Sequence, residues 1–194
     1  MARIVMSGPQ NMSLDGVVQD PDGLEGFGLG GWFVEFGGQD LEEWSKLALA
    51  EALGAEAWLL GRRSYEFFGE RWQPRDGALA DRLNSMPKYV VSSTLEDPDW
   101  NNSTVLTGEV VNEVSNLKHE LHGEINVIAS FQLGRTLIEH DLLDELRLMV
   151  FPVVLGAGER LFGETSHKKP MRLLDTRNVD DRVAYLTYEF VREA

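Results

Sequence analysis

The chain alternates short apolar runs with amphipathic segments, and this alternation restricts the fold more than any other feature of the sequence. The runs Ala57–Leu60 and Ile125–Ile128 are short enough to be buried strands. Further strands are expected over residues 88–92, 104–106 and 146–150, and helices over 110–121 and about 131–139. Strands that alternate with helices build a largely parallel sheet that is covered on both faces.

The end of the chain has a different pattern. From Val183 to Phe190, successive residues fall on two alternating faces, which is typical of an exposed antiparallel strand. With 194 residues, of which 43% are hydrophobic, the chain is expected to form one domain over residues 1–194. The sequence therefore predicts an α/β fold with a mixed sheet.

Charge and composition exclude several classes of function. Lys and Arg number 18 against 32 Asp and Glu, a net charge of −14, which opposes binding to nucleic acid. The longest apolar run, Leu148–Leu155, is too short to span a membrane, so no membrane partner and a cytoplasmic location are expected. There is no cysteine, and His119 and His122 lack a third ligand, so no metal site is expected.

A glycine-rich stretch from Asp20 to Gly38 contains seven glycines together with Trp32, Phe33 and Phe36. Glycine opposes regular structure, whereas aromatic side chains favour burial. The stretch is therefore interpreted as a long loop that folds over a ligand or a partner subunit, or as a flexible surface loop. Asp40 and Glu43 then form a capping box for a helix that presents Trp44 on its apolar face.

Three predicted strands end in residues suited to anions, and ligands of parallel α/β sheets bind at such ends. After the first come Gly61, Arg62, Arg63 and Ser64, where the arginines could bind an anion or pair with Glu66 and Glu70. The second ends in Ser92, Ser93 and Thr94, whose hydroxyls either donate to phosphate or cap the turn. The third ends in Ala129, Ser130 and Phe131, with Ser130 as N-cap and as a possible ligand.

The order of several motifs resembles one family. The motifs are Ser13-Leu14-Asp15-Gly16, Gly61-Arg62-Arg63-Ser64-Tyr65, Val90 to Leu95, Asp144-Glu145-Leu146-Arg147 and Pro152 to Phe162. Over about residues 3–190 the chain is similar to bacterial riboflavin-biosynthesis reductases of the RibD C-terminal type, a branch of the dihydrofolate reductase fold. This resemblance implies a three-layer α/β/α domain, NADPH as hydride donor and a homodimer.

The resemblance also implies roles for individual residues. Gly61 to Ser64 would contact the phosphates of NADPH, Ser92 to Thr94 the adenosine 2′-phosphate, and Ala129 to Phe131 the pyrophosphate. Family members carry Gly-Gly or Gly-Ser where this chain has Ala129-Ser130, and a basic residue where Val17 and Val18 follow Gly16. The first of these differences adds a methyl group beside the pyrophosphate.

Two carboxylates are candidates for the catalytic proton. Asp15 would lie near the nicotinamide, or would form only a turn with Gly16; Asp40 would be an acid between Trp32 and Trp44, or only a helix cap. The two tryptophans would then line the substrate site. The expected function is NADPH-dependent reduction of a small heterocycle, as in 5-amino-6-(5-phosphoribosylamino)uracil reductase. Alternatives are a dihydrofolate- or pteridine-type reductase, a non-catalytic NADPH-binding protein and a dimeric scaffold.

Overall fold

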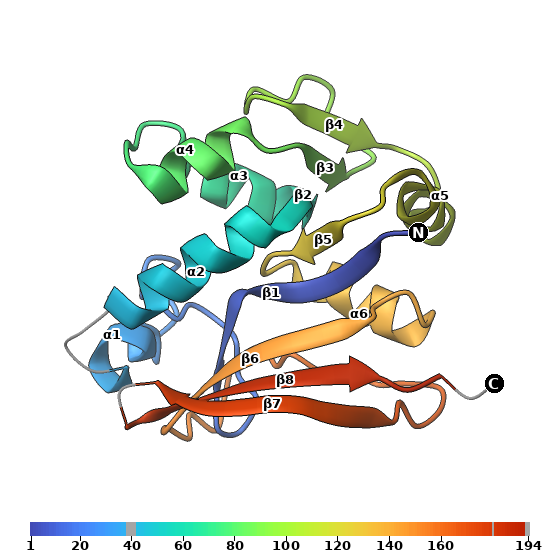
Figure 1. The fold of residues 1–194 in the computed structure, drawn as a ribbon. Coiled ribbons are helices and arrows are strands. Elements are labelled where there is room, and N and C mark those ends of the chain that lie inside the picture. The colour runs from blue at the N-terminus through green and yellow to red at the C-terminus, as the bar shows by residue number, and fades with distance from the viewer. Residues whose placement is uncertain (38–41, 180, 193–194) are drawn as a thin grey trace.

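The fold is built around an eight-stranded sheet with the order β4-β3-β2-β5-β1-β6-β8-β7 (Figure 1). The computed structural model describes residues 1–37, 42–179 and 181–192. Its strands are β1 (Arg3–Ser13), β2 (Ala55–Gly61), β3 (Lys88–Val91), β4 (Ser103–Leu106), β5 (Glu124–Val127), β6 (Glu145–Phe151), β7 (Met171–Val179) and β8 (Val183–Phe190). The first six strands pair in parallel, and β6, β8 and β7 pair antiparallel.

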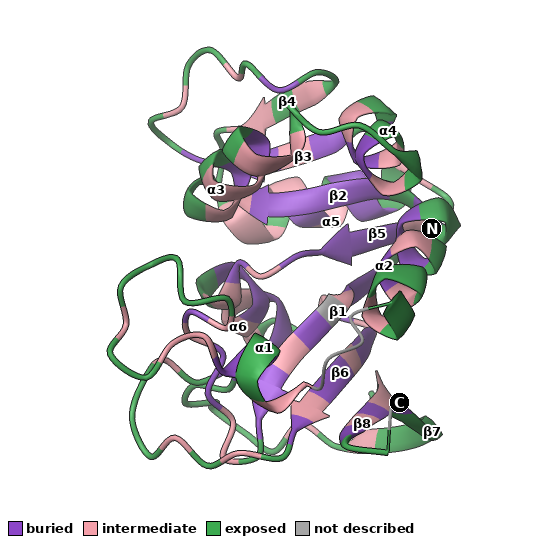
Figure 2. Cartoon of the chain, turned by 90° about the vertical axis from the view of Figure 1, so that its left-hand side faces the viewer, coloured by how far each residue is buried: buried purple, intermediate pink, exposed green. Residues whose placement is uncertain are grey.

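Helices cover both faces of this sheet. They are α1 (Trp32–Phe36), α2 (Glu42–Gly54), α3 (Arg62–Trp72), α4 (Ala78–Ser85), α5 (Val110–Glu120) and α6 (Phe131–Glu139). Residues of α5 and α6 pack on one face with Ile4, Ile125 and Leu146, and residues of α2, α3 and α4 pack on the other with Trp58 and Leu60. Figure 2 shows the resulting pattern of buried central strands between helices with exposed outer surfaces. The predicted three-layer α/β/α arrangement is confirmed.

A third apolar cluster supports the end of the sheet near the chain terminus. Trp32 and Phe33 of α1 pack against Phe151 of β6, with ring centroids 5.4 and 5.5 Å apart, and Tyr185 of β8 belongs to the same cluster. This packing accounts for the alternation at the start of the final strand: Val183 and Tyr185 are buried in this cluster, whereas Ala184 and Leu186 are half-buried, and from Thr187 to Phe190 the burial no longer alternates. The region from Met171 to Val179, for which no strand was expected, pairs with β8 as an edge strand.

Strand β1 changes partners along its length, and this opens the sheet. Arg3 to Met6 pair with β5, but from Gln10 to Ser13 the strand pairs only with β6, after a register shift between Met6 and Gln10. The chain leaves β1 toward α1 and α2 on one face, and leaves β5 toward α6 on the opposite face. Adjacent parallel strands with connections to opposite faces create a crevice at their carboxyl ends.

The part of the chain that the structure describes contains no helix with the length and apolarity needed to cross a bilayer.

Candidate nucleotide-binding site

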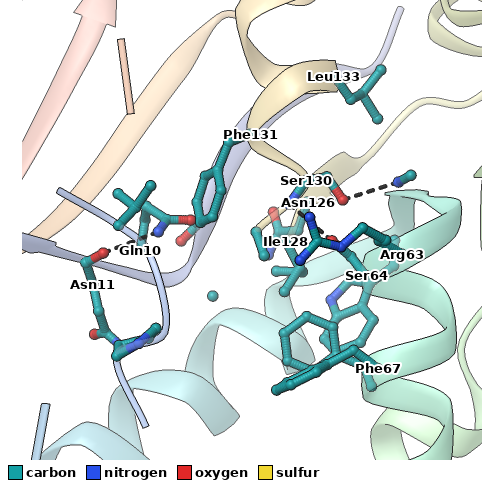
Figure 3. Close-up of a pocket in the computed structure, with 18 of the residues that line it drawn as sticks. Gln10, Asn11, Arg63, Ser64, Phe67, Asn126, Ile128, Ser130, Phe131 and Leu133 are labelled. Atoms are coloured by element: carbon teal, nitrogen blue, oxygen red, sulfur yellow. Dashed lines mark hydrogen bonds between the residues drawn. The ribbon is translucent and has the colours of Figure 1, made fainter. Parts of the chain in front are cut away.

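A cavity of about 920 Å³ occupies the crevice between β1 and β5. Its walls come from the carboxyl ends of the central strands, the first turns of α3 and α6, the inner face of α2 and the loop after β1. Figure 3 shows Gln10 and Asn11 on one side of the cavity, with Asn126, Ser130 and Arg63 across from them. The cavity is large enough to contain a dinucleotide portion together with a small second ligand.

Two helix N-termini meet at this cavity and are tied to each other. The N–H of Gly61, just before α3, donates to Ser130 Oγ at 2.9 Å, and the N–H of Ser130, just before α6, donates to Ser64 Oγ at 3.0 Å (Figure 3). Neither helix has a side-chain hydrogen bond at its own N-terminus. The predicted N-cap role of Ser130 is therefore wrong in its chemistry: Ser130 occupies the cap position, but its hydroxyl joins α6 to α3.

The backbone before α6 has an unusual conformation. Ala129 and Ser130 both lie in the left-handed region, with φ of 46° and 49°. This conformation costs an L-residue about 1–2 kcal/mol, and glycine avoids most of that cost. The chain keeps an alanine and a serine where a glycine pair would be relaxed, and the N–H of Ser130 within this turn donates to Ser64.

Gly61 leaves open space at the same place. Its φ of −78° and ψ of 159° are available to any residue. A methyl group there would lie 3.8 Å from Ser130 Oγ, which is ordinary van der Waals contact. The fold itself does not require glycine at this position, and the missing side chain leaves the backbone at the start of α3 open toward the cavity.

Arg62 and Arg63 are the cations that line the cavity among the described residues. Arg62 pairs with Glu66 at 2.7 Å and donates to Thr94 Oγ1 at 2.6 Å, while Arg63 pairs with Glu25 at 3.2 Å. The predicted ion pair with Glu66 is thus present. Because these pairs are exposed, each contributes little to stability, and a phosphate could replace the carboxylate partner at small cost.

The three hydroxyl residues after β3 do not line the cavity. Ser92 Oγ accepts hydrogen bonds from the N–H groups of Thr94 and Leu95 at 3.2 and 3.0 Å, so it caps the turn, as one of the two interpretations expected. Ser93 and Thr94 are exposed, and Thr94 contacts Arg62 at the rim. A role of these residues at a 2′-phosphate stays a prediction.

Two predicted site residues lie away from the cavity. Asp15 accepts from Ser13 Oγ and from the N–H groups of Leu155 and Gly156, so it fastens the loop after β1 to the loop after β6. The hydroxyl of Ser13 and these two N–H groups lower the pKa of Asp15 to about 2, against the opposing effect of burial. Trp32 is 1% exposed and donates to the carbonyl of Gln19, which makes it a core residue.

Of the remaining candidates, Trp44 and Phe131 line the cavity, together with Ala129. Trp44 stands on α2 with its ring in edge contact with Phe33 at 5.4 Å. Asp40 lies outside the described residues. No cluster of three or more potential metal ligands occurs within residues 1–37, 42–179 and 181–192.

The structure adds polar cavity residues that the sequence did not single out. Glu51 of α2 accepts from Ser7 Oγ, from the N–H of Gly8 at 2.8 Å and from the hydroxyl of Tyr185 at 2.6 Å. It therefore holds the irregular part of β1 just before Gln10 and Asn11. Burial and the neighbouring Glu51 carboxylate raise the pKa of Tyr185. Glu51 could have been identified from the sequence, because it is a glutamate on the buried face of a predicted helix.

The glycine-rich loop is held by one buried aspartate. Asp20 is 2% exposed and accepts from the N–H groups of Glu25 and Phe27, both at 2.9 Å. Although burial opposes ionisation, these N–H groups lower its pKa. Asp20, Asp22 and Glu25 line the cavity, so this loop forms part of its wall.

The fold and the cavity define an α/β domain of the dihydrofolate reductase type with a site at the fork of its sheet. Dihydrofolate reductase from Enterococcus faecalis, solved with NADP(H) and RAB-propyl, superposes with a TM-score of 0.59 at 15% identity over 98% of this chain and 96% of that one. The RibD C-terminal domain model matches residues 10–185. The chain belongs to the RibD C-terminal domain family.

Three further proteins are similar to this chain in fold or in sequence. A Shewanella sp. PV-4 protein named for riboflavin biosynthesis has a TM-score of 0.75 at 23% identity, covering 99% of this chain and all of that one. A pyrimidine reductase-like protein from Corynebacterium diphtheriae has a TM-score of 0.60 at 14% identity, covering 99% and 92%. The uncharacterised protein YyaP of Bacillus subtilis is 28% identical over 137 residues, 68% of this chain and 72% of its own length.

Proposed function

We propose that the protein is an NADPH-dependent reductase of a small heterocyclic substrate. The observation that carries this proposal is the junction of α3 and α6, where two helix N-termini without side-chain caps face one cavity beside Arg62 and Arg63. Two helix N-termini and two guanidinium groups form a favourable site for a diphosphate. Membership of the RibD C-terminal domain family supports a reductase of that type.

Different residues of the junction would bind different parts of the cofactor. The first turns of α3 and α6 would bind the phosphates, Gly61 would allow them to approach the backbone, and Arg62 beside Thr94 would bind an additional phosphate at the rim. When bound, NADPH supplies the hydride, and the protein contributes position and electrostatics. Gln10, Asn11 and Trp44, on the opposite wall, would position the substrate.

The carboxylates of the cavity wall are already acceptors within the chain. Asp20, Asp22 and Glu25 accept from backbone or arginine donors, Glu51 accepts from three donors, and Glu159 pairs with Arg135 at 3.3 Å. Their oxygens are therefore engaged within the protein in this structure. We therefore propose that water delivers the proton unless Asp40, outside the described residues, does so.

Titration with NADPH and NADH by nicotinamide fluorescence tests cofactor binding. We expect NADPH to bind more tightly, and Arg62→Ala to weaken NADPH by about tenfold while changing NADH less, because NADH lacks the 2′-phosphate. Arg172→Ala is the matched control, since Arg172 is also an exposed arginine paired with a glutamate but stands on β7. Equal losses of affinity for both cofactors would indicate that Arg62 binds the diphosphate that NADPH and NADH share.

Turnover then separates an enzyme from a protein that only binds NADPH. Oxidation of NADPH at 340 nm is followed with pteridine, dihydrofolate and ribosylaminouracil substrates. Failure of both cofactors to bind at millimolar concentration would contradict the proposed function altogether.

A further inference from the structure

Strand β1 passes the edge of the cavity without the regular pairing of a strand. Its pairing with β5 ends at Met6, and its register against β6 shifts before Gln10. Ser7 and Gly8 lie in this interval, and both line the cavity. A backbone that leaves the sheet ladder needs other acceptors for its N–H groups.

Gly8 has little conformational freedom at this point. Its φ of 124° belongs to a region that glycine adopts and other residues rarely do. A Cβ at Gly8 would lie 2.5 Å from Cδ1 of Ile128, the residue that follows β5. Because Ile128 also lines the cavity, a shift of Gly8 would change the width of the fork between the two strands.

One buried carboxylate, that of Glu51 on α2, holds this segment in place. Glu51 is 8% exposed, and its Oε2 accepts from Ser7 Oγ and from the N–H of Gly8 at 2.8 Å. Its other oxygen, Oε1, accepts from the hydroxyl of Tyr185 on β8 at 2.6 Å. The side chain of Glu51 therefore joins the irregular part of β1 to the antiparallel end of the sheet.

Packing does not explain a glutamate at this position. The other buried residues of α2 are Ala48 and Ala52, which are apolar. Glu51 also lines a smaller hollow together with Arg147, but Arg147 pairs with two other glutamates. A buried carboxylate is costly unless donors surround it. The role of Glu51 is therefore to accept hydrogen bonds from β1 and β8.

Tyr185 keeps the Glu51 carboxylate in one orientation. It is buried in the apolar cluster that contains Trp32 and Phe151, so its ring has a fixed position. Burial and the Glu51 carboxylate raise the pKa of Tyr185, and its hydroxyl stays a donor at neutral pH. A fixed donor selects one geometry of the carboxylate and thus of the backbone that donates to it.

We propose that Glu51 and Tyr185 are positioning residues for the reaction. Tyr185 orients the carboxylate of Glu51, and this carboxylate fixes the Ser7–Gly8 backbone. The position of that backbone sets the wall formed by Gln10 and Asn11, where the substrate would bind (Figure 3). The inference rests on the proposed function for the place of the substrate. The α3–α6 junction contains neither residue, so the pair acts on substrate use rather than on cofactor affinity.

Glu51→Leu and Glu51→Gln form a matched pair for a test by NMR on the full chain. Leucine is of similar size but has no acceptor, whereas glutamine keeps an acceptor oxygen and can donate to the hydroxyl of Tyr185. We expect hydrogen exchange of the Gly8 amide to be at least about tenfold faster in Glu51→Leu and nearly unchanged in Glu51→Gln. The side-chain amide signals of Gln10 and Asn11 should shift in the leucine variant only.

Glu56→Leu is the control for these signals. Glu56 on β2 also accepts from two backbone N–H groups, those of His122 and Gly123 before β5. Its removal should speed exchange at Gly123 and leave Gly8 unchanged. Exchange of Gly8 at the wild-type rate in Glu51→Leu would overturn the proposal.

Tyr185→Phe provides the test if Glu51→Leu does not fold. The substitution keeps the ring in its cluster and removes only the hydroxyl that donates to Glu51. It should shift the side-chain amide signals of Gln10 and Asn11 as well. Tyr188→Phe is its control, because Tyr188 lies on the opposite face of β8. Identical effects of the two tyrosine variants would contradict a role of Tyr185.

Steady-state kinetics separates positioning from a general loss of stability. With NADPH and the pteridine, dihydrofolate or ribosylaminouracil compound that the wild type reduces, Glu51→Leu should raise KM at least about tenfold. The dissociation constant of NADPH should change less than about twofold, and Glu51→Gln should restore KM. An unchanged KM in a variant with altered Gly8 exchange would overturn the positioning role.

The NMR test also distinguishes this inference from the proposed function. A wild type that binds neither nicotinamide cofactor, or reduces none of these compounds, contradicts only the proposed reductase. Exchange at Gly8 and the signals of Gln10 and Asn11 still decide whether Glu51 sets the cavity wall.

Discussion

At the scale of single residues, the site differs from the sequence expectation mainly in backbone conformation. Propensity placed Ser130 at an N-cap, which is its position, but nothing local indicates that Ala129 and Ser130 both adopt positive φ. That conformation depends on the contacts of Ser130 with Gly61 and Ser64, residues distant in sequence. Asn126, in contrast, could have been noticed, because an amide inside the apolar run Ile125–Ile128 is unusual for a buried strand.

Ala129→Gly should stabilise the protein. Glycine adopts a φ of 46° without the clash of a Cβ, which offsets its larger entropy in the unfolded chain, so we expect a gain of about 1 kcal/mol in the free energy of unfolding. Urea unfolding measures it. Ala157→Gly is the control: Ala157 is outside the set of described non-glycine residues with positive φ, so this change should give no gain. A loss of stability in Ala129→Gly would contradict the strain.

Asp15 should make stability depend on acid pH. Its pKa is about 2 in the folded protein against an ordinary 3.8, so ionised Asp15 stabilises the fold above about pH 4, and this contribution is lost as the pH falls toward 2. We expect Asp15→Asn to lower the free energy of unfolding by about 1–2 kcal/mol at pH 7, with the difference shrinking below pH 4. Urea unfolding from pH 7 to pH 2.5 measures both.

The exposed Asp97→Asn variant is the control for this experiment and should follow the wild-type pH curve. A constant difference between wild type and Asp15→Asn over the whole pH range would show that Asp15 acts through packing rather than through its charge.

At the scale of elements, the local sequence pattern was sufficient to predict a helix or strand where packing and propensity favour the same structure. The helix over 131–139 and the strand Ala57–Leu60 appear with nearly the expected bounds, because one face of the helix and both faces of the strand are apolar. Strand β7 was missed because Met171–Val179 is mostly exposed and has no alternation; its conformation comes from pairing with β8. The order of the elements, rather than any one of them, predicted the place of the cavity.

The link between α3 and α6 should matter to both stability and cofactor binding. Ser64→Ala removes the acceptor of the Ser130 N–H, and we expect a loss of about 1 kcal/mol in stability and of several-fold in NADPH affinity. Thermal unfolding and fluorescence titration measure the two effects. Ser45→Ala, an exposed serine on α2, should change neither. Unchanged NADPH affinity in Ser64→Ala would contradict the proposal that the α3–α6 junction is part of the cofactor site.

At the scale of the whole molecule, the net charge of −14 opposes compaction. Many carboxylates have local partners, such as Glu124 with Arg147 and Asp144 with Lys118, but the excess of acidic residues remains unbalanced. The predicted homodimer would bring two such chains together, so it stays a prediction whose formation should also depend on ionic strength.

Salt should therefore stabilise the fold. The Debye length falls from about 30 Å at 0.01 M salt to about 8 Å at 0.15 M, which screens repulsion across the whole molecule but affects the short, partly buried pairs much less. We expect the melting temperature to rise by a few degrees between these concentrations of NaCl, an effect of about 1 kcal/mol. The double variant Glu70→Gln and Glu96→Gln, at two exposed positions, reduces the net negative charge from −14 to −12. Its melting temperature should rise less with NaCl. A fall in melting temperature with NaCl would mean that local ion pairs outweigh the global repulsion.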